Sequence, residues 1–412
     1  MRYIGLDVHK EFCEVAVLED GTFRSGPKVP TRPEDLEVFA QSLGPDDEVA
    51  LEATGGAFAV ARILEPHVRR VVVANPMAVR AIAWAKVKTD RLDARTLAKL
   101  LAAGFLPGVW VGDDRTRVLR RLTSRRAQLV RQRTRAKNQI HAVLQRTLKG
   151  RPPVSDLFGK GGRVWLGEQD LPPDEAQTVE GCLREIDFLT GELVLVDRAI
   201  AERVLSWEEA RRIMTIPGIG APTAAAFMAA IGDIRRFPSP RHLVGYLGLD
   251  PRVRQSGSSP ARHGAISKQG ASETRHLLVE AAWAATKTPG PLRAFGERIR
   301  ARRGGNVATV AVARKLAVLC WHLLTRGENY AFARPSLVRE KVRRLELLTG
   351  AQRRIGHRNP VRVFATPEQR RREQELAHQA EVAYRRLVKD WQQTRGGGAD
   401  AATGARISKA LK

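Results

Sequence analysis

The first 110 residues alternate between short apolar runs and amphipathic segments. Short runs of apolar and β-branched residues predict strands, and these runs occupy residues 2–8, 12–19, 48–54 and 69–75. Apolar residues at helical spacing predict helices, over residues 33–43, over 57–67 and from Thr89 to about Gly104. The apolar stripe of this last helix comprises Leu92, Leu97, Leu100 and Leu101. The order of three strands, of which the third has no apolar run of its own, then helix, strand, helix, strand and helix is typical of a ribonuclease-H-like α/β fold.

Residues 111–208 have the pattern of two long helices. The stretch 115–149 holds twelve Arg or Lys residues, no acid, and apolar residues at helical spacing. After a loop rich in Gly and Pro (150–173), a second helix carries a heptad of Ile186, Leu189, Leu193, Val196 and Ile200. This pattern predicts either a helical hairpin or an intermolecular coiled coil. The one-signed charge favours contact with a partner over a simple spacer, with Arg125, Arg126, Arg131 and Arg133 as candidate nucleic-acid contacts.

Residues 209–332 are predicted to form a separate, mostly helical domain. It opens with TIPGIG between two apolar helices, a pattern that resembles a helix-hairpin-helix element. Glycines there let backbone N–H groups approach a phosphate, which makes Gly218 and Gly220 candidate nucleic-acid contacts; a simple tight turn is the alternative. Residues 333–412 form a basic tail with helical patches, whose Gly- and Ala-rich end, from about Arg395, is predicted to be disordered.

Four acids stand out in the N-terminal segment. Asp7 and Glu52 each close an apolar run, and Asp90 and Asp93 lie three residues apart, on one face of the predicted helix. If these segments converge, the acids share one pocket and require a countercharge. Carboxylate oxygens suit Mg²⁺ or Mn²⁺, and two such ions clamp both oxygens of an in-line phosphoryl displacement. The alternative is an exposed strand end or a helix cap, with Asp90 as N-cap.

The charge balance points to a polyanionic partner. The net charge of the 412-residue chain is +26, which favours nucleic acid. An anionic membrane surface is the alternative, but no run of about 18 apolar residues predicts a bilayer span. No secretion signal is visible, and Cys13, Cys182 and Cys320 are too widely separated for a disulfide framework or a CxxC zinc site. We therefore expect a cytoplasmic protein with buried cysteines.

A polar, basic segment interrupts the C-terminal helices. Ser256, Ser258 and Ser259 lie within four residues, flanked by the cations Arg252, Arg254, Arg262, His263 and Lys268. A serine hydroxyl is a poor nucleophile until it is deprotonated or oriented, whereas the surrounding cations can hold a phosphate. Taken alone, the segment favours a phosphate-binding loop over a nucleophile. A base would have to come from another domain, and the four acids are candidates.

Together these motifs resemble a known family. MRYIGLDVHK, LEATGG, KTDRLDA, IPGIG, the SG pair and VATVAVARKLAVLCWHLLTRGENY are similar to segments of the DEDD-type transposases of the insertion sequence 110 family, over about residues 1–110 and 209–332. The resemblance implies a RuvC-like, ribonuclease-H-type domain at 1–110 and a coiled-coil linker at 111–208. It also implies that Asp7, Glu52, Asp90 and Asp93 bind divalent metal, and that a C-terminal transposase domain carries the nucleophile Ser256.

The same resemblance implies a reaction and its partners. Members of this family are DNA recombinases that excise and insert their own element, guided by a structured non-coding RNA. They act as homo-oligomers, dimers or tetramers, in which one protomer's serine meets another's acids. Strand cleavage would leave a covalent phosphoserine link to DNA. The expected location is the prokaryotic cytoplasm, at the nucleoid.

Two departures from the family pattern affect the site. The serine motif reads QSGSSP where a further glycine is usual, which leaves Ser258 as an alternative nucleophile. Ser272 stands where asparagine is common. Neither departure removes a proposed catalytic group.

Two other functions remain open from the sequence. A metal-dependent RuvC-like nuclease of the Holliday-junction type would use water and need no serine, but it would not require the domain after residue 209. A non-catalytic nucleic-acid-binding protein with a decayed acid site is the second alternative. Against it, all four acids and the serine are present.

Overall fold

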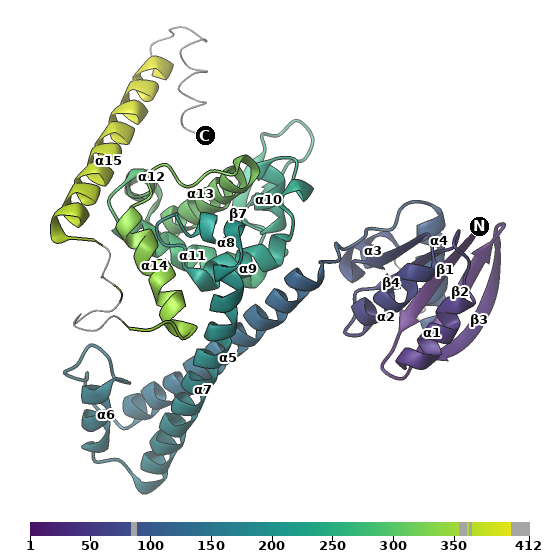
Figure 1. Cartoon of the computed structure of the whole chain (residues 1–412), viewed down its shortest axis with the longest axis horizontal. Coiled ribbons are helices and arrows are strands. Elements are labelled where there is room, and N and C mark those ends of the chain that lie inside the picture. The colour runs from purple at the N-terminus through teal and green to yellow at the C-terminus, as the bar shows by residue number, and fades with distance from the viewer. Residues whose placement is uncertain (84–88, 354–360, 362–364, 397–412) are drawn as a thin grey trace. The chain divides into compact units, whose positions relative to one another are not determined.

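The computed structural model describes residues 1–83, 89–353, 361 and 365–396. The chain divides into two compact units, Met1–Gly112 and Asp113–Lys412 (Figure 1). The first unit contains a five-stranded sheet with helices, and the second is mostly helical. The predicted combination of an α/β N-terminal part with a mostly helical C-terminal part is therefore confirmed.

The sheet of the first unit has the order β3-β2-β1-β4-β5. Its strands are β1 (Arg2–Val8), β2 (Phe12–Glu19), β3 (Thr22–Pro30), β4 (Glu48–Glu52) and β5 (Arg70–Ala74). β1, β2 and β3 pair antiparallel, whereas β4 pairs parallel with both β1 and β5. The four apolar runs form four of these strands. β3 is largely exposed and polar, which explains why periodicity alone does not mark it.

Helices cover both faces of this sheet. α1 (Pro33–Gln41) and α2 (Ala57–Leu64) pack on the face that carries Ile4, Leu6 and Val8, while α3 (Pro76–Ile82) and α4 (Asp90–Ala102) pack on the other. A short 3₁₀ turn, Glu65–His67, follows α2, and α3 was not predicted. Leu97 and Leu101 of α4 are buried, but Leu92 is 39% exposed, so its predicted place in the stripe is wrong.

An ion pair fixes the start of β4 against the start of β1. The Asp47 carboxylate, 3% exposed, accepts from the Arg2 guanidinium, with Nε at 3.0 Å, and from the Gly44 amide at 2.7 Å. Immediately after this clamp, Tyr3 pairs with Glu48. Burial alone would raise the pKa of Asp47, but the Arg2 and Gly44 donors hold it below its usual range. The ion pair thus helps to fix the register in which β1 and β4 pair as far as their other ends.

We expect Asp47→Asn to lower the free energy of unfolding of the first unit by about 1–3 kcal/mol at neutral pH. Because the folded-state pKa of Asp47 is depressed, its stabilisation is present above its unfolded pKa of about 3.9 and is lost as the pH falls through the folded value. Urea titrations of the full-length chain at about pH 7 and about pH 3 measure this. A wild-type advantage that is equal at both pH values would contradict the assignment.

The second unit begins with a helical hairpin. α5 (Asp114–Arg146) and α7 (Pro173–Leu205) pack side by side within one chain, and α6 (Lys160–Gly167) packs against their distal ends (Figure 1). The heptad residues Ile186, Leu189, Leu193 and Ile200 are buried, and Val196 is partly buried. Of the two predicted arrangements, the intramolecular hairpin is the one observed. α6 lies inside the stretch predicted as loop, so that part of the prediction is wrong.

The remaining elements of the second unit surround one core. They are α8 (Glu208–Ile213), α9 (Ala221–Ile231), a 3₁₀ turn (Ile234–Arg236), α10 (Pro240–Tyr246), β6 (Pro251–Arg254), β7 (Arg262–Ile266), α11 (Ser272–Lys287), α12 (Pro291–Arg303), α13 (Gly305–Arg326), α14 (Pro335–Leu348) and α15 (Pro367–Gly396). The core collects Leu119 of α5, Val204 of α7, Phe227 of α9, Cys320 of α13 and Leu345 of α14. The chain therefore forms two compact units, whereas the sequence predicts four segments.

The C-terminal segment is largely helical and attached to this core. Glu381 of α15, 1% exposed, accepts from the Gly290 amide at 3.0 Å and from Arg293 Nε at 2.9 Å, which ties α15 to the start of α12. α15 runs to Gly396. The rest of the predicted disordered end, 397–412, lies outside the described residues.

α13 bears on the membrane prediction. Among the described residues, this helix alone is long and apolar enough to cross a bilayer. The sequence pattern predicts no such segment, so sequence and structure differ here. Half of its apolar window is buried, and Val312, Leu316 and Cys320 lie in the core of the second unit. All three cysteines are buried, as predicted.

Candidate active site

Asp7 lies on the face of the sheet that α4 covers. Side chains alternate along a strand, and Ile4, Leu6 and Val8 point into the opposite core, so Gly5 and Asp7 face α4. A Cβ atom on Gly5 would lie 1.9 Å from the Ala94 carbonyl oxygen of α4. The glycine therefore lets the α4 backbone lie directly on β1, which brings the first turn of the helix close to Asp7.

The start of α4 positions two more acids. Thr89 is the N-cap, and its hydroxyl oxygen accepts from the Leu92 amide at 3.3 Å. Asp90 and Asp93 occupy the first turn, where the helix dipole favours negative charge. Because Thr89 caps the helix, the alternative role of Asp90 as N-cap is wrong. The Asp90 carboxylate is 53% exposed, so it can meet a ligand from solvent.

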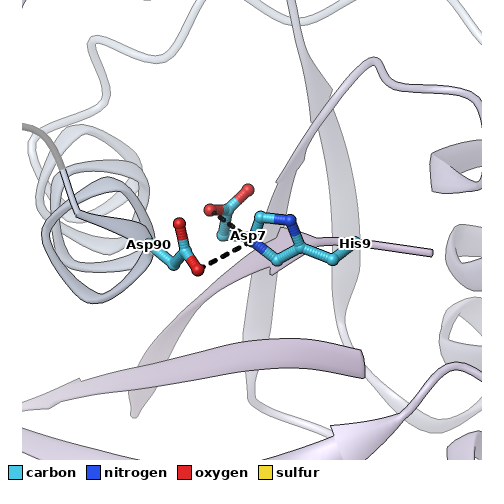
Figure 2. Close-up of side chains that lie close together, drawn as sticks. All are labelled: Asp7, His9 and Asp90. Carbon is cyan, nitrogen blue, oxygen red and sulfur yellow. Dashed lines mark hydrogen bonds and ion pairs between the residues drawn. The ribbon is translucent and has the colours of Figure 1, made fainter. Parts of the chain in front are cut away.

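His9 joins Asp7 to Asp90. Its Nε2 atom lies 3.1 Å from Asp7 Oδ2 and 3.3 Å from Asp90 Oδ2 (Figure 2). One ligand atom from each of the three side chains lies within 4.8 Å of the others, and no further such group of His, Cys, Asp or Glu occurs among the described residues. Sequence reasoning did not include His9 in the site. Its position two residues after Asp7, just beyond β1, was the available indication.

The environment of Asp7 disfavours its charge. Burial, the largest effect, raises the pKa of the Asp7 carboxyl, and the nearby Asp93 and Asp90 raise it further, while His9 lowers it. The Asp7 side chain is only 15% exposed. An ionised Asp7 is therefore costly, and a bound cation would offset that cost.

Glu52 ends β4 beside the end of β1. Leu6 pairs with Leu51 in parallel register, so Glu52 follows at the level of Asp7. Ala50, two residues earlier, packs into the core under α4, which places Glu52 on the same face of the sheet. Neither Glu52 nor Asp93 belongs to the close group around His9. The fold thus brings Asp7 and Asp90 together directly and sets Glu52 and Asp93 at the border of the same region.

The serine segment forms a β-hairpin in the second unit. β6 and β7 pair antiparallel, with Arg254 opposite Arg262, a pairing that the sequence pattern does not predict. Ser256 and Ser258 lie in the exposed connection, where the Ser259 amide donates to the Ser256 carbonyl at 3.3 Å and Gly257 has φ +56°. Lys268, after β7, is exposed as well. The hairpin presents hydroxyls and cations to solvent, and the acid at its base, Asp250, accepts from Ser267 Oγ at 2.6 Å.

The four candidate arginines of α5 have partners within the chain. Arg126 pairs with Asp197 at 2.6 Å and Arg125 with Glu192 at 3.5 Å, both on α7. Arg131 Nη1 lies 3.4 Å from the Glu273 carboxylate, and Arg133 Nη1 lies 3.4 Å from the Thr190 hydroxyl. Acids of other helices thus balance part of the one-signed charge of α5. That charge is weaker evidence for an external partner than the sequence indicates.

The two glycines of the TIPGIG turn have different roles. Gly218 has φ +85°, and a Cβ atom there would lie 2.1 Å from the Ala281 carbonyl oxygen, so its lack of a side chain serves packing against α11. Gly220 is the N-cap of α9, and a Cβ atom there would meet only Pro222, at 3.9 Å. The side-chain position of Gly220 is therefore open, whereas that of Gly218 is filled by α11.

Comparison with known proteins relates both units to transposases. Residues 4–149 match a DEDD transposase model of the IS110 type, and residues 210–297 match the transposase IS116/IS110/IS902 family. The transposase for insertion sequence element IS1111A of Coxiella burnetii is 32% identical over 265 residues, which are 59% of this chain and 68% of that protein. The transposase for element IS1328 of Yersinia enterocolitica is 28% identical over 287 residues, 69% of this chain and 85% of its own.

A protein described as gene-inverting, and not as a transposase, is similar to this chain as well. The pilin gene-inverting protein of Moraxella bovis is 26% identical over 285 residues, covering 67% of this chain and 80% of that protein. The resemblance seen in the sequence motifs is confirmed by the matches to both units. This chain belongs to the IS110 family of DEDD transposases.

Proposed function

We propose that this transposase cleaves and rejoins the DNA strands of an insertion sequence, using the acids of the first unit and Ser256 of the second. The observation that carries the proposal is the convergence of Asp7 and Asp90, from β1 and α4, within reach of one small ligand. The strand order, with three antiparallel strands followed by two parallel ones, supports a RuvC-like, ribonuclease-H-type unit.

The donor set around Asp7 fits a divalent cation. The carboxylates of Asp7, Glu52, Asp90 and Asp93 offer the hard oxygen ligands that Mg²⁺ and Mn²⁺ take. His9 Nε2 adds a nitrogen, which suits Mn²⁺ better than Mg²⁺. When bound, such ions neutralise charge on a scissile phosphate and activate a hydroxyl. The four acids and His9 would bind and orient these ions.

Ser256 supplies the nucleophile in this proposal. Its Oγ forms a bond to the scissile phosphorus while the bond from phosphorus to the DNA oxygen breaks, and the serine proton passes to a carboxylate base. The released DNA oxygen takes a proton and becomes a hydroxyl. The hydroxyl of the exchanged strand later attacks the phosphoserine and regenerates Ser256. The exposed cations Arg254 and Arg262 can hold the phosphate during both steps.

The partners proposed are DNA, a structured guide RNA and further copies of the chain, as a dimer or tetramer at the prokaryotic nucleoid. The excess of cations supports backbone contacts to DNA and RNA, whose affinity would fall with salt. Arg125 and Arg131 are 46% and 68% exposed and so remain available beside their internal partners. Pairing between guide RNA and DNA would supply sequence specificity.

Divalent metal should stabilise the wild-type chain but not Asp7→Asn. Metal binding to the folded state adds on the order of 2–3 kcal/mol when free metal is about 100 times its Kd, and Asp7 lies at the centre of the donor set. Thermal unfolding in EDTA, Mg²⁺ and Mn²⁺ measures this. Asp46→Asn, an exposed acid of the same unit, serves as the control. An equal response of Asp7→Asn and wild type would exclude Asp7 as a ligand.

A further inference from the structure

A cavity of about 430 Å³ lies in the second unit, between α12, α13 and α15. This volume is in the range of pockets that hold small molecules. Its walls are mostly apolar, and four aromatic rings contribute to them, those of Phe295, Tyr330, Phe332 and Tyr384. Such a lining suits a flat aromatic ligand, because the faces and edges of aromatic rings attract one another.

Phe332 lies at the opening of this cavity. It is 46% exposed although it lines the cavity, whereas Tyr330, two residues earlier, is 8% exposed. The two rings pack edge to face with their centroids 5.8 Å apart. Hydrogen bonds fix the turn that carries them, since the Tyr330 amide donates to Thr215 Oγ1 at 2.9 Å and the Ala333 amide donates to the Tyr330 carbonyl at 2.9 Å. An aromatic ring is thus held in place where a ligand would enter.

Two cations belong to the same region. Lys315 of α13 lines the cavity, and Arg298 of α12 lines an adjoining hollow of about 460 Å³, which shares Tyr384 with the cavity. Within the described part of the chain, no group accepts a hydrogen bond from the buried Arg298 Nε. Burial lowers the pKa of Lys315, and the nearby Arg298 lowers it further. An anion bound between Arg298 and Lys315 would offset the repulsion between these two charges.

Aromatic rings next to cations are the surroundings of a nucleotide rather than of a hydrocarbon. Unpaired bases stack on aromatic side chains, and Lys and Arg hold the phosphates of the strand. The exposed Lys389 of α15 also lines the adjoining hollow, where it would hold the next phosphate. The acid of that hollow, Glu297, is paired with Arg385 at 2.5 Å. A duplex would not enter the cavity, because its bases are stacked inside the helix.

We infer that this cavity binds an unpaired nucleotide of single-stranded DNA or RNA, with its base against Phe332 and its phosphate between Arg298 and Lys315. The inference rests on the proposed binding of nucleic acid by this chain. It gives a role to α15, which lies outside the segments 4–149 and 210–297 that match the family.

The test measures the affinity of the full-length chain for short labelled probes by fluorescence anisotropy. The probes are single-stranded DNA, RNA of the same sequence, a strand of abasic sugar phosphates and a DNA duplex. Phe332→Ala should bind single-stranded DNA, the RNA or both about tenfold more weakly, the loss of one stacking contact. It should bind the abasic strand and the duplex as wild type does. A loss confined to DNA or to RNA identifies which strand supplies the nucleotide.

Two further variants of this kind serve as controls. Phe332→Tyr keeps an aromatic ring at the opening and should bind every probe like wild type. Phe188→Ala removes a phenylalanine of α7 that is 65% exposed but lies outside the cavity, so it should also bind like wild type.

Arg298→Gln tests the phosphate contact. For single strands, the slope of log affinity against log salt changes by about 0.7 for each phosphate contact. We expect the slope of Arg298→Gln to be shallower than that of wild type by this amount with the single strand that Phe332→Ala binds more weakly. A purely structural role of Arg298 would leave the slope unchanged.

Several results would overturn the inference. They are undiminished binding of both single strands by Phe332→Ala, an equal loss with the abasic strand, a similar loss in Phe188→Ala, and an unchanged salt slope in Arg298→Gln. If wild type binds the duplex but neither single strand, the inference fails and the proposed binding of DNA stands. If wild type binds none of the probes, both fail.

Discussion

Asp90→Asn is expected to slow strand cleavage by about 100- to 1000-fold without unfolding the chain. The Asp90 carboxylate is 53% exposed and is not the cap of α4, so its loss leaves the helix start intact. What disappears is one negative charge within 3.3 Å of His9 and next to Asp7, in the group proposed to hold metal. Cleavage of labelled element-end DNA, with the flanking transcript and Mg²⁺, measures the rate.

A matched control is available in the same unit. Asp35 occupies the first turn of α1, as Asp90 occupies that of α4, but it lies outside the group around Asp7. Asp35→Asn should therefore cleave at the wild-type rate. RNA binding should be unchanged in both variants, because neither substitution removes a cation. Wild-type cleavage by Asp90→Asn would exclude its proposed role.

Ser256→Ala is expected to abolish recombination, with a loss on the order of 10⁶-fold, because no other group takes over a missing nucleophile. Ser258→Ala is the control, because it makes the same substitution two residues further along the same exposed connection. It should retain activity. Both variants should bind DNA like wild type, since neither hydroxyl carries charge. Excision of the element in cells, read as the rejoined donor junction, measures recombination.

The two serine variants also settle the register of the motif. Loss of activity in Ser258→Ala with retention in Ser256→Ala would move the nucleophile by two residues. Retention in both would remove serine attack from the proposal and leave the acid site as the sole source of chemistry.

The acids could be anticipated because local pattern governs their positions. Asp7 and Glu52 each stand at the end of a run of apolar residues that is buried as a strand. Parallel pairing of the two strands brings their ends to one edge of the sheet. Asp90 and Asp93 share the first turn of an amphipathic helix. The convergence itself depends on Gly5, whose missing side chain admits the α4 backbone. No local pattern shows that contact, so the sequence predicts the acids but not their distances.

The features that no local pattern locates depend on contacts distant in sequence. β3 and the β6–β7 hairpin are polar and exposed, so backbone pairing rather than an apolar period defines them. The charge balance of α5 depends on acids from α7 and α11. Lys341 lies in a segment predicted to be a basic tail, yet it binds carbonyls more than 120 residues away. Periodicity reports neighbours along a helix or strand and gives no information on such partners.

The most direct test of serine attack is to trap the protein–DNA adduct. Wild-type protein, Mg²⁺, labelled element-end DNA and the flanking transcript are mixed, denatured and digested, and the DNA-linked peptide is identified by mass spectrometry. Serine attack predicts a phosphodiester link on the peptide that contains Ser256, absent from Ser256→Ala. Cleavage with no adduct on any residue would contradict it and would establish a nuclease that uses water at the site of Asp7 and Asp90.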